Sequence, residues 1–227
     1  MRPKKIGFFD WFSAAGLLAL LGGCSPLGFL LSPSSSEQKI AAQFPLYAQK
    51  DKSVYLAVRP SAGSRTDADI PGLLQKTLAA DFHRKIKIPP EKIFQMSAAL
   101  HNPSVAFSWS QVEQEARRVQ AAYLLSVEIV EFQAVPMGSQ NYYMGNLAVR
   151  TFLAETESGQ IVWPPEKTPR LIRVAVDFEP KGRSQLVHRM LTAVSHCIVR
   201  HLYPCSKAAF RVSEELEPLE SLMNSTE

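Results

Sequence analysis

The sequence predicts a single α/β domain of the α+β kind, with about three helices packed on a mixed, largely antiparallel sheet. Three observations predict this class. Segments with alternating apolar residues occur among segments with helical periodicity, in the order strand, helix, strand, helix, strand, strand, strand, helix. The later strands are joined by short turns, which favour antiparallel neighbours. The length of 227 residues allows one well-cored domain and a tether.

The first half of the domain contains two predicted helices and two strand regions. N-cap residues and a capping box mark the helix starts, because their side chains satisfy free backbone N–H groups. The predicted elements are a strand over 53–59, a helix from Asp67 or Asp69 to about 82, strand pieces at 85–88 and 92–96, and a helix that starts at the capping-box pair Ser110 and Glu113.

The second half reads as a hairpin, two further strands and a long helix. Alternating apolar residues over 121–132 and 142–155 predict two long strands, and the turn-forming segment 136–141 separates them. Shorter strands follow at 161–163 and 171–178. The clearest helical periodicity in the chain covers 184–202.

The N-terminus has the pattern of a bacterial lipoprotein signal peptide. Arg2, Lys4 and Lys5 precede an apolar run over 11–21 that is too short to span a bilayer. The tetrapeptide 21–24, Leu-Gly-Gly-Cys, resembles a lipobox that is cleaved before Cys24. Cys24 would then carry fatty acyl chains, palmitate among them, and hold the domain on a membrane. An uncleaved anchor is the alternative, since residues 26–31 prolong the apolar stretch.

These patterns divide the chain into four parts. We expect a signal peptide over 1–23, the lipidated cysteine and a flexible tether over 24–50, the α/β domain over 51–205, and an acidic, partly disordered tail over 206–227. Residue 25 is Ser, without the Asp that retains some lipoproteins at the inner membrane. We therefore expect an outer-membrane location facing the periplasm.

Charge and composition exclude some classes of partner. The formal net charge is +4, and basic residues are interspersed with acidic ones without a dense Lys/Arg run. Nucleic-acid binding usually needs such a run, so no nucleic-acid partner is expected. No cofactor is expected either, because the sequence has no phosphate-binding glycine loop.

The remaining cysteines, Cys197 and Cys205, form an even pair in a protein expected in an oxidising compartment. We predict a disulfide between them, with free buried thiols as the alternative. A zinc site is a further alternative, since Cys197 and His201 are one helical turn apart. His188 and His196 are too far apart along a helix to join one compact site, so no metal is expected.

Catalytic motifs are missing from the sequence. It contains no Gly-x-Ser-x-Gly elbow and no His-Glu-x-x-His, so the chain is not expected to be an enzyme. A Cys–His pair lacks a recognisable third group. The remaining enzyme alternative is a hydrolase that joins the histidines of the last helix with Glu128 or Glu131.

The predicted turn of the hairpin carries Met137, Tyr142, Tyr143 and Met144. Tyr and Met are frequent where proteins meet, so these residues are the expected contact surface for a partner. Cross-strand packing within the hairpin is the alternative interpretation. A groove lined by Tyr142, Tyr143 or Trp163 would instead suit a small ligand or a cell-wall glycan.

The strand 54–60, the strand 121–129 with Glu131 and Phe132, and the turn and strand 157–163 together resemble a group of envelope lipoproteins. This group includes the curli-secretion lipoprotein, the activator lipoproteins of penicillin-binding proteins and the amino-terminal domain of TolB. The resemblance covers about residues 53–203 and implies a non-catalytic periplasmic adaptor or scaffold, with oligomers in some members. One branch builds a secretion pore from long membrane-crossing hairpins, and the short connections expected here depart from it. The functional hypothesis is therefore an adaptor that binds another envelope protein during assembly or secretion.

Overall fold

The computed structural model describes residues 38–97, 109–138, 141–207 and 209. The chain divides into two compact units, Met1–Gln38 and Lys39–Glu227, and all the elements below belong to the second. The predicted signal peptide, Cys24 and the tail after Ala209 lie outside the described residues. In the part of the chain that is described, none of the helices has the length and apolar character to cross a membrane.

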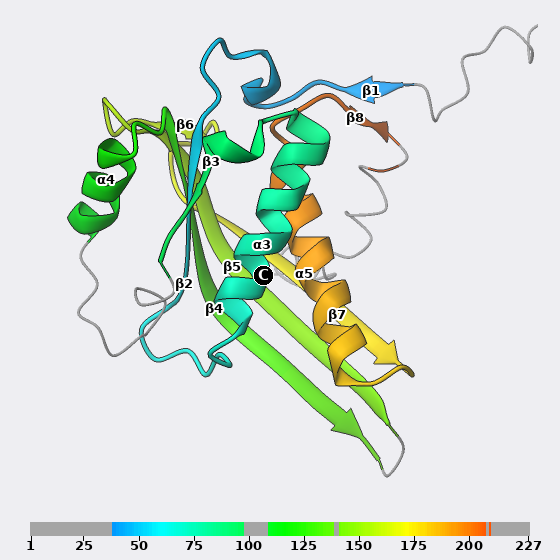
Figure 1. The fold of residues 1–227 in the computed structure, drawn as a ribbon. Coiled ribbons are helices and arrows are strands. Elements are labelled where there is room, and N and C mark those ends of the chain that lie inside the picture. Colours follow the sequence, from blue (N-terminus) through cyan, green and yellow to red (C-terminus); the bar gives the residue numbers. More distant parts are fainter. Residues whose placement is uncertain (1–37, 98–108, 139–140, 208, 210–227) are drawn as a thin grey trace, which may run out of the picture. The chain divides into compact units, whose positions relative to one another are not determined.

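The second unit is built on a six-stranded sheet in the order β3-β2-β4-β5-β6, with β7 also paired to β5 (Figure 1). Strand β2 runs parallel to β3 and β4, because helical crossovers connect them. The β4–β5, β5–β6 and β5–β7 pairs are antiparallel. The strands are β2 (Val54–Pro60), β3 (Ile93–Gln95), β4 (Tyr123–Met137), β5 (Tyr142–Glu155), β6 (Ile161–Trp163) and β7 (Arg170–Glu179). The predicted α+β class with a mixed, largely antiparallel sheet is confirmed.

In the described part of the chain, three α-helices cover the two faces of the sheet unequally. Helices α3 (Ile70–Asp81) and α5 (Arg183–Val199) lie side by side on one face, called the inner face here (Figure 1). Helix α4 (Trp109–Arg118) packs on part of the opposite, outer face. Alternation along β2 explains both contacts, because Leu56 and Val58 join the main core under α3 while Tyr55 and Ala57 join the small cluster under α4.

Close packing between α5 and the sheet depends on a glycine in β5. A Cβ atom at Gly145 would lie 2.7 Å from the Gln133 carbonyl oxygen and 2.9 Å from both Leu186 Cδ2 and Met190 Sδ. No larger residue fits at this distance. Gly145 therefore lets α5 approach the strands that form the hairpin.

The hairpin of β4 and β5 is longer than the sequence predicts. Strand β4 continues through Pro136 to Met137, and its pairing with β5 extends to Met137 and Tyr142. Beyond Ile129, β4 is no longer paired with β2, so Pro136 lies on an edge where its missing N–H costs no ladder hydrogen bond. Figure 1 shows this end of the hairpin extending past the helices.

Two predictions in the first half are wrong in detail. Residues 85–88 do not form the predicted strand piece, because Phe82–Ile86 continues α3 as a π-helical turn with Phe82 and Ile86 buried in the main core. Ser110 lies inside α4 and not before it. Glu113 accepts a hydrogen bond from Trp109 Nε1 at 2.6 Å, so its carboxylate binds a side chain of the first turn.

The predicted tether extends too far along the chain. Strand β1 (Lys39–Ile40) pairs with β8 (Cys205–Ser206), and the 3-10 helix η1 (Leu46–Ala48) follows. The Leu46 side chain is fully buried in the main core. Gln43 Oε1 accepts hydrogen bonds from Trp163 Nε1 at 2.9 Å and from Arg170 at 3.1 Å. Residues 39–48 are thus part of the folded unit, which sequence periodicity missed because the segment is short and irregular.

Candidate functional site

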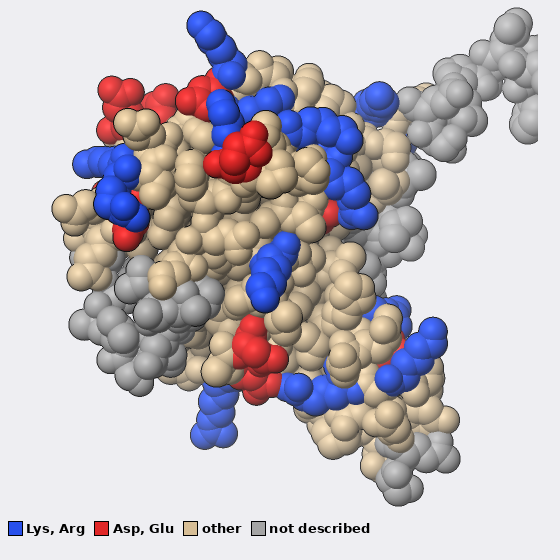
Figure 2. Space-filling model, viewed as in Figure 1, with Lys and Arg blue, Asp and Glu red and all other residues tan. Residues whose placement is uncertain are grey.

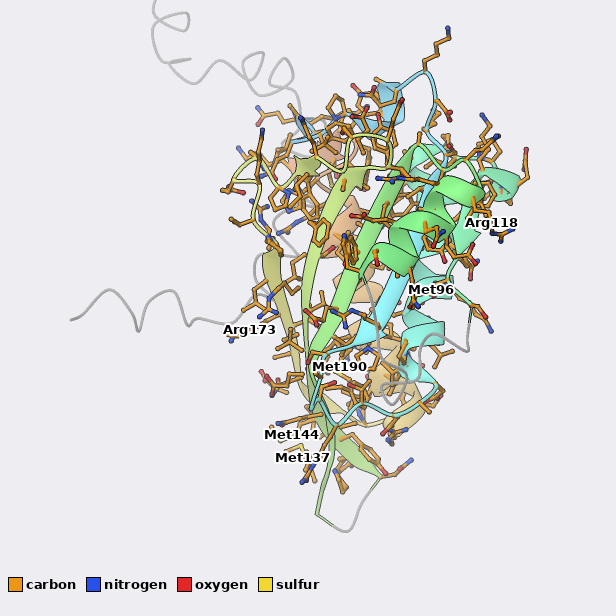
Figure 3. All side chains as sticks on the ribbon, turned by 90° about the vertical axis from the view of Figure 1, so that its left-hand side faces the viewer. Met96, Arg118, Met137, Met144, Arg173 and Met190 are labelled. Atoms are coloured by element: carbon orange, nitrogen blue, oxygen red, sulfur yellow. The ribbon has the colours of Figure 1, made fainter. Side chains whose placement is uncertain are left out.

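The free end of the β4–β5 hairpin carries a group of exposed apolar side chains. Val135 is 46% exposed, Met137 39%, Met144 40% and Phe178 of β7 50%. Together with Tyr142, whose ring lies 4.9 Å from that of Phe178, these residues are called the tip patch here. Figure 3 shows Met137 and Met144 close together near the free end of the hairpin.

Strand register explains why these side chains share one face. Val135 is paired with Met144, and Met137 with Tyr142, so all four point to the same side of the hairpin. This side is the outer face, whereas α3 and α5 cover the inner face. A β-bulge in β7 between Val176 and Glu179 brings Phe178 to the outer face as well.

Tyr143, the remaining predicted contact residue, is placed differently. Its side chain packs against the main hydrophobic core on the inner face. The structure thus brings Met137, Tyr142 and Met144 together and separates Tyr143 from them. Sequence analysis missed Val135 and Phe178, since the turn was expected to begin at 136 and only the β7 bulge places Phe178 beside Tyr142.

The predicted disulfide is not present. Cys197 and Cys205 are free, buried thiols. Cys205 belongs to β8, where it is paired with Ile40, and its Sγ accepts a hydrogen bond from the Tyr203 hydroxyl at 3.7 Å. The β1–β8 pairing fixes the position of Cys205, and Cys197 packs in the main core, so the free-thiol alternative describes the structure.

The α5 histidines take part in separate polar contacts. Lys85 Nζ donates to His196 Nδ1 at 3.1 Å, and His196 Nε2 donates to the Ala209 carbonyl at 3.1 Å. Burial, with the charge of Lys85, lowers the pKa of His196. His188 is exposed on the same helix. Among the described residues, no group of three or more His, Cys, Asp or Glu side chains is arranged to hold a metal ion.

His201 lies against the fully buried Trp163, with ring centroids 5.5 Å apart. Its Nε2 accepts from Arg200 Nε at 3.4 Å. Burial, together with the charges of Arg200 and Arg170, lowers the pKa of His201 to about 3. This histidine is neutral near pH 7, and the burial of Trp163 excludes that residue from lining a ligand groove.

A buried carboxylate connects α3 with α5. Asp81 Oδ2 accepts hydrogen bonds from Ser195 Oγ at 2.7 Å and Lys85 Nζ at 3.1 Å, and Oδ1 accepts from Arg84 at 2.7 Å. Burial raises the pKa of Asp81, but the hydrogen bond from Ser195 and the charge of Lys85 outweigh it and lower the pKa. Ser195 is fully buried, so substrate cannot reach its hydroxyl. The cluster joins the two helices, and its carboxylate and hydroxyl are buried.

Glu128 and Glu131, the carboxylates expected in the hydrolase alternative, lie on the opposite side of the sheet from α5. Glu128 Oε1 accepts from Arg59 at 2.9 Å, and Oε2 accepts from Arg150 at 3.2 Å. These arginines extend from the outer face, because they are the register partners of Glu128 in β2 and β5. Glu131 also faces outward, where it lines a hollow of about 230 Å³ with Asn146 and Arg173. The sheet therefore separates both carboxylates from the α5 histidines.

Charge is distributed evenly on the face that carries α3 and α5. Figure 2 shows Lys and Arg interspersed with Asp and Glu over this face, and few charges around the end of the hairpin. A groove of about 510 Å³ between the two helices includes Asp69, Arg183 and His188 in its lining, so it too has mixed charge. A continuous basic surface for a nucleic acid is not seen on the described part of this face.

No protein-family model matches the chain, and no curated protein matches its sequence. Solved structures share a similar arrangement at low identity. The PelC dodecamer from Paraburkholderia phytofirmans is 12% identical with a TM-score of 0.41, over 73% of this chain and 97% of that one. Lipoprotein GNA1162 from Neisseria meningitidis is 14% identical with a TM-score of 0.38, over 65% and 98%. The LpoB C-terminal domain from Salmonella enterica is 17% identical with a TM-score of 0.35, over 60% and 96%. These values concern the fold alone and assign no activity or partner to this chain.

Proposed function

We propose that this chain is a lipid-anchored protein of the bacterial cell envelope, and that its domain is a non-catalytic adaptor or scaffold for another envelope protein. Cys24 in its lipobox-like context supports the anchor, with the outer membrane facing the periplasm as its location. The tip patch supports the adaptor role and is the single observation that carries it.

The physical argument rests on exposure and chemistry. A contiguous group of large apolar side chains in water is unfavourable for an isolated protein and is typical of protein-binding surfaces. Met side chains adapt their shape to a partner, and Tyr and Phe supply large contact areas. The tip patch lies at the end of a hairpin, where a partner can approach without meeting the helices (Figure 1). An apolar partner surface with few charges fits it.

The other functional hypotheses have less support. Catalysis would need accessible groups in one place, but Glu128 is ion-paired on the outer face and Ser195 is buried with Asp81. The small-ligand or glycan alternative needs a groove lined by Tyr142, Tyr143 or Trp163. Trp163 is fully buried, Tyr143 packs on the core, and the Tyr142 ring packs against Phe178 in the tip patch. Neither arrangement offers a surface comparable to the tip patch.

The proposal is tested by photo-cross-linking in intact envelopes, with p-benzoylphenylalanine placed at Met144 of the full chain. We expect one envelope protein to be cross-linked repeatedly. Adding Met137→Glu should abolish this cross-link, because a buried charge opposes an apolar interface. The matched control places the cross-linker at Leu73, which is 39% exposed on α3. Equal labelling from both positions, or labelling that Met137→Glu leaves unchanged, would refute the adaptor surface.

A further inference from the structure

A hollow of about 530 Å³ lies at the end of the sheet where β4 begins and β5 ends. It is called the acidic hollow here, and its polar lining includes Asp51, Arg117, Glu155, Thr156 and Glu157. Figure 3 shows Arg118, which follows Arg117 at the end of α4, at the opposite end of the domain from Met137 and Met144. The acidic hollow is therefore separate from the tip patch, and its volume is typical of small-molecule sites.

Negative charge dominates this lining, because it contains three carboxylates and one guanidinium. Asp51 Oδ1 accepts a hydrogen bond from the Ser53 amide at 3.1 Å and lies 3.9 Å from Lys92 Nζ. The hydrogen bond from Ser53 lowers the pKa of Asp51, so this side chain is ionised near pH 7. Glu155 Oε2 accepts a hydrogen bond from Ser158 Oγ at 2.6 Å. These contacts hold one oxygen of each carboxylate, and the second oxygen of each can accept a hydrogen bond from a ligand.

Tyr123, which is paired with Glu155 across β4 and β5, reports the combined charge of two of these side chains. Burial raises the pKa of the Tyr123 hydroxyl, and the charges of Glu155 and Asp51 raise it further. A carboxylate raises the pKa of a phenol in this way only when the two groups are near each other. Asp51 and Glu155 thus act together on one region, although they are far apart in sequence.

The spacing of the carboxylates suits an extended ligand and not a single metal ion. Among the described residues, no three His, Cys, Asp or Glu side chains are arranged to hold a metal ion. Separate ammonium groups on one small molecule can reach carboxylates that are spread over a hollow. Arg117 Nε donates to the Thr156 carbonyl at 3.2 Å, and within the described part of the chain this leaves both terminal nitrogens of the guanidinium to bind a carboxylate of the ligand.

Thr156 gives an independent indication of a ligand. This residue is 6% exposed, and its Oγ1 has no hydrogen-bond partner among the described residues. Buried hydroxyl groups are nearly always hydrogen-bonded, to the protein, to ordered water or to a ligand. Because Thr156 lines the acidic hollow, a polar ligand there can supply the partner that this hydroxyl lacks.

We propose that the acidic hollow binds a free diamino acid. The two ammonium groups of the ligand bind the carboxylates of Asp51, Glu155 and Glu157, and its carboxylate binds the Arg117 guanidinium. Two cationic groups and one anionic group of the ligand thereby meet three anionic groups and one cationic group of the protein, which gives specificity through charge. This site goes beyond the adaptor function and does not depend on it.

Isothermal titration calorimetry of the full chain in detergent tests the class of ligand, with L-lysine as the probe. Three analogues each remove one charge: norleucine lacks the side-chain ammonium, cadaverine lacks the carboxylate, and Nα-acetyl-L-lysine lacks the α-ammonium. We expect saturable binding of L-lysine and about tenfold weaker binding of each analogue, because each loses a charge-assisted hydrogen bond. The acetylated analogue also represents a diamino acid at the end of a peptide, so its weaker binding identifies the free compound.

Substitutions connect this binding to the acidic hollow. Glu157→Gln should weaken L-lysine binding by about tenfold. Glu166→Gln is the matched control, since the Glu166 side chain is 61% exposed and lies outside the lining, and it should leave the affinity unchanged. Arg117→Gln should weaken the binding of L-lysine but not of cadaverine, because cadaverine has no carboxylate for Arg117 to bind.

The Arg117 comparison separates recognition from a structural effect, since a distorted hollow would bind both compounds more weakly. Four results would overturn the proposal. These are an absence of saturable L-lysine binding, equal binding of L-lysine and an analogue, equal effects of Glu157→Gln and Glu166→Gln, and a loss of cadaverine binding in Arg117→Gln.

Discussion

His201 shows how one buried side chain couples folding to pH. The ring lies against Trp163, and Arg170 is placed over the same indole at 5.6 Å. Burial, with the charges of Arg200 and Arg170, lowers the pKa of His201 from its ordinary 6.5 to about 3. Protonation inside the fold would place a third positive charge beside two arginines in a poorly solvated site. The folded state therefore stabilises the neutral form of the His201 side chain.

At the residue scale, this predicts a loss of stability as the pH falls below 6.5. The unfolded chain binds a proton at His201 near pH 6.5, whereas the folded chain binds it only near pH 3, so unfolding takes up a proton between these values. The free energy of unfolding should fall by about 1.4 kcal/mol per pH unit from this residue in that window. Denaturant unfolding measured from pH 6.5 to 4 should show that the free energy of unfolding of His201→Gln falls less steeply with falling pH than that of the unsubstituted protein. His188→Gln, at an exposed position, is the control and should keep the original slope; identical slopes in all three proteins would contradict the prediction.

The residue scale also limits what sequence can say about the candidate site. The Met and Tyr residues near the hairpin turn were predictable from composition, and Met137, Tyr142 and Met144 do lie together. Tyr143 could not be assigned to the opposite face, because the face depends on where β4 ends and on its register with β5. Phe178 is far away in sequence, and only a bulge in β7 brings it to the patch.

At the element scale, the segment that contains β1 and η1 joins the start of the folded unit to its C-terminal region. The β1–β8 pairing and the hydrogen bonds from the Gln43 and Phe44 amides to the His201 carbonyl hold it there. Leu46 anchors the segment by filling part of the main core. This segment thus acts as a structural part of the domain, although its composition resembles a linker.

The anchoring role of Leu46 leads to a stability prediction. Leu46→Ala removes a fully buried side chain and leaves a cavity, so the free energy of unfolding should fall by about 2–5 kcal/mol. The matched control is Tyr47→Ala at the next position, which is 40% exposed and should change stability by about 0.5 kcal/mol or less. Chemical denaturation measures both. Similar small effects of the two substitutions would show that residues 39–48 contribute little to the domain.

Elements with a strong apolar periodicity were predictable, whereas elements whose type or length depends on tertiary contacts were not. The apolar stripes of α3 and α5 and the alternation in β2, β5 and β7 gave correct element types, because side chains at these periods point to a common face. The segment 85–88 was predicted as a strand because Ile86 and Ile88 alternate with lysines, whereas Ile86 ends the π-helical turn that continues α3. The extension of β4 through Pro136 depends on β2 ending beside Ile129, which local sequence does not encode.

For the whole molecule, the described core draws on residues from Phe44 onward, so the lipid anchor and the domain are expected to act independently. Cys24→Ala should move the protein from the membrane fraction to the soluble envelope fraction with an unchanged melting temperature. Ser25→Ala keeps the acylated cysteine and should remain with the membrane. If Cys24→Ala also remains there, the apolar stretch over 26–31 acts as an uncleaved anchor instead.

The sequence alone determined the lipobox-like pattern at Cys24, the α+β class and most element types, because these depend on local composition and on the period of apolar residues. The tertiary structure alone decided that residues 39–48 belong to the domain, that the sheet separates Glu128 from the α5 histidines, and that Cys197 and Cys205 stay apart. It also placed Val135, Met137, Tyr142, Met144 and Phe178 on one face. These features arise from strand order and register, which depend on contacts between residues distant in sequence and therefore have no local signature.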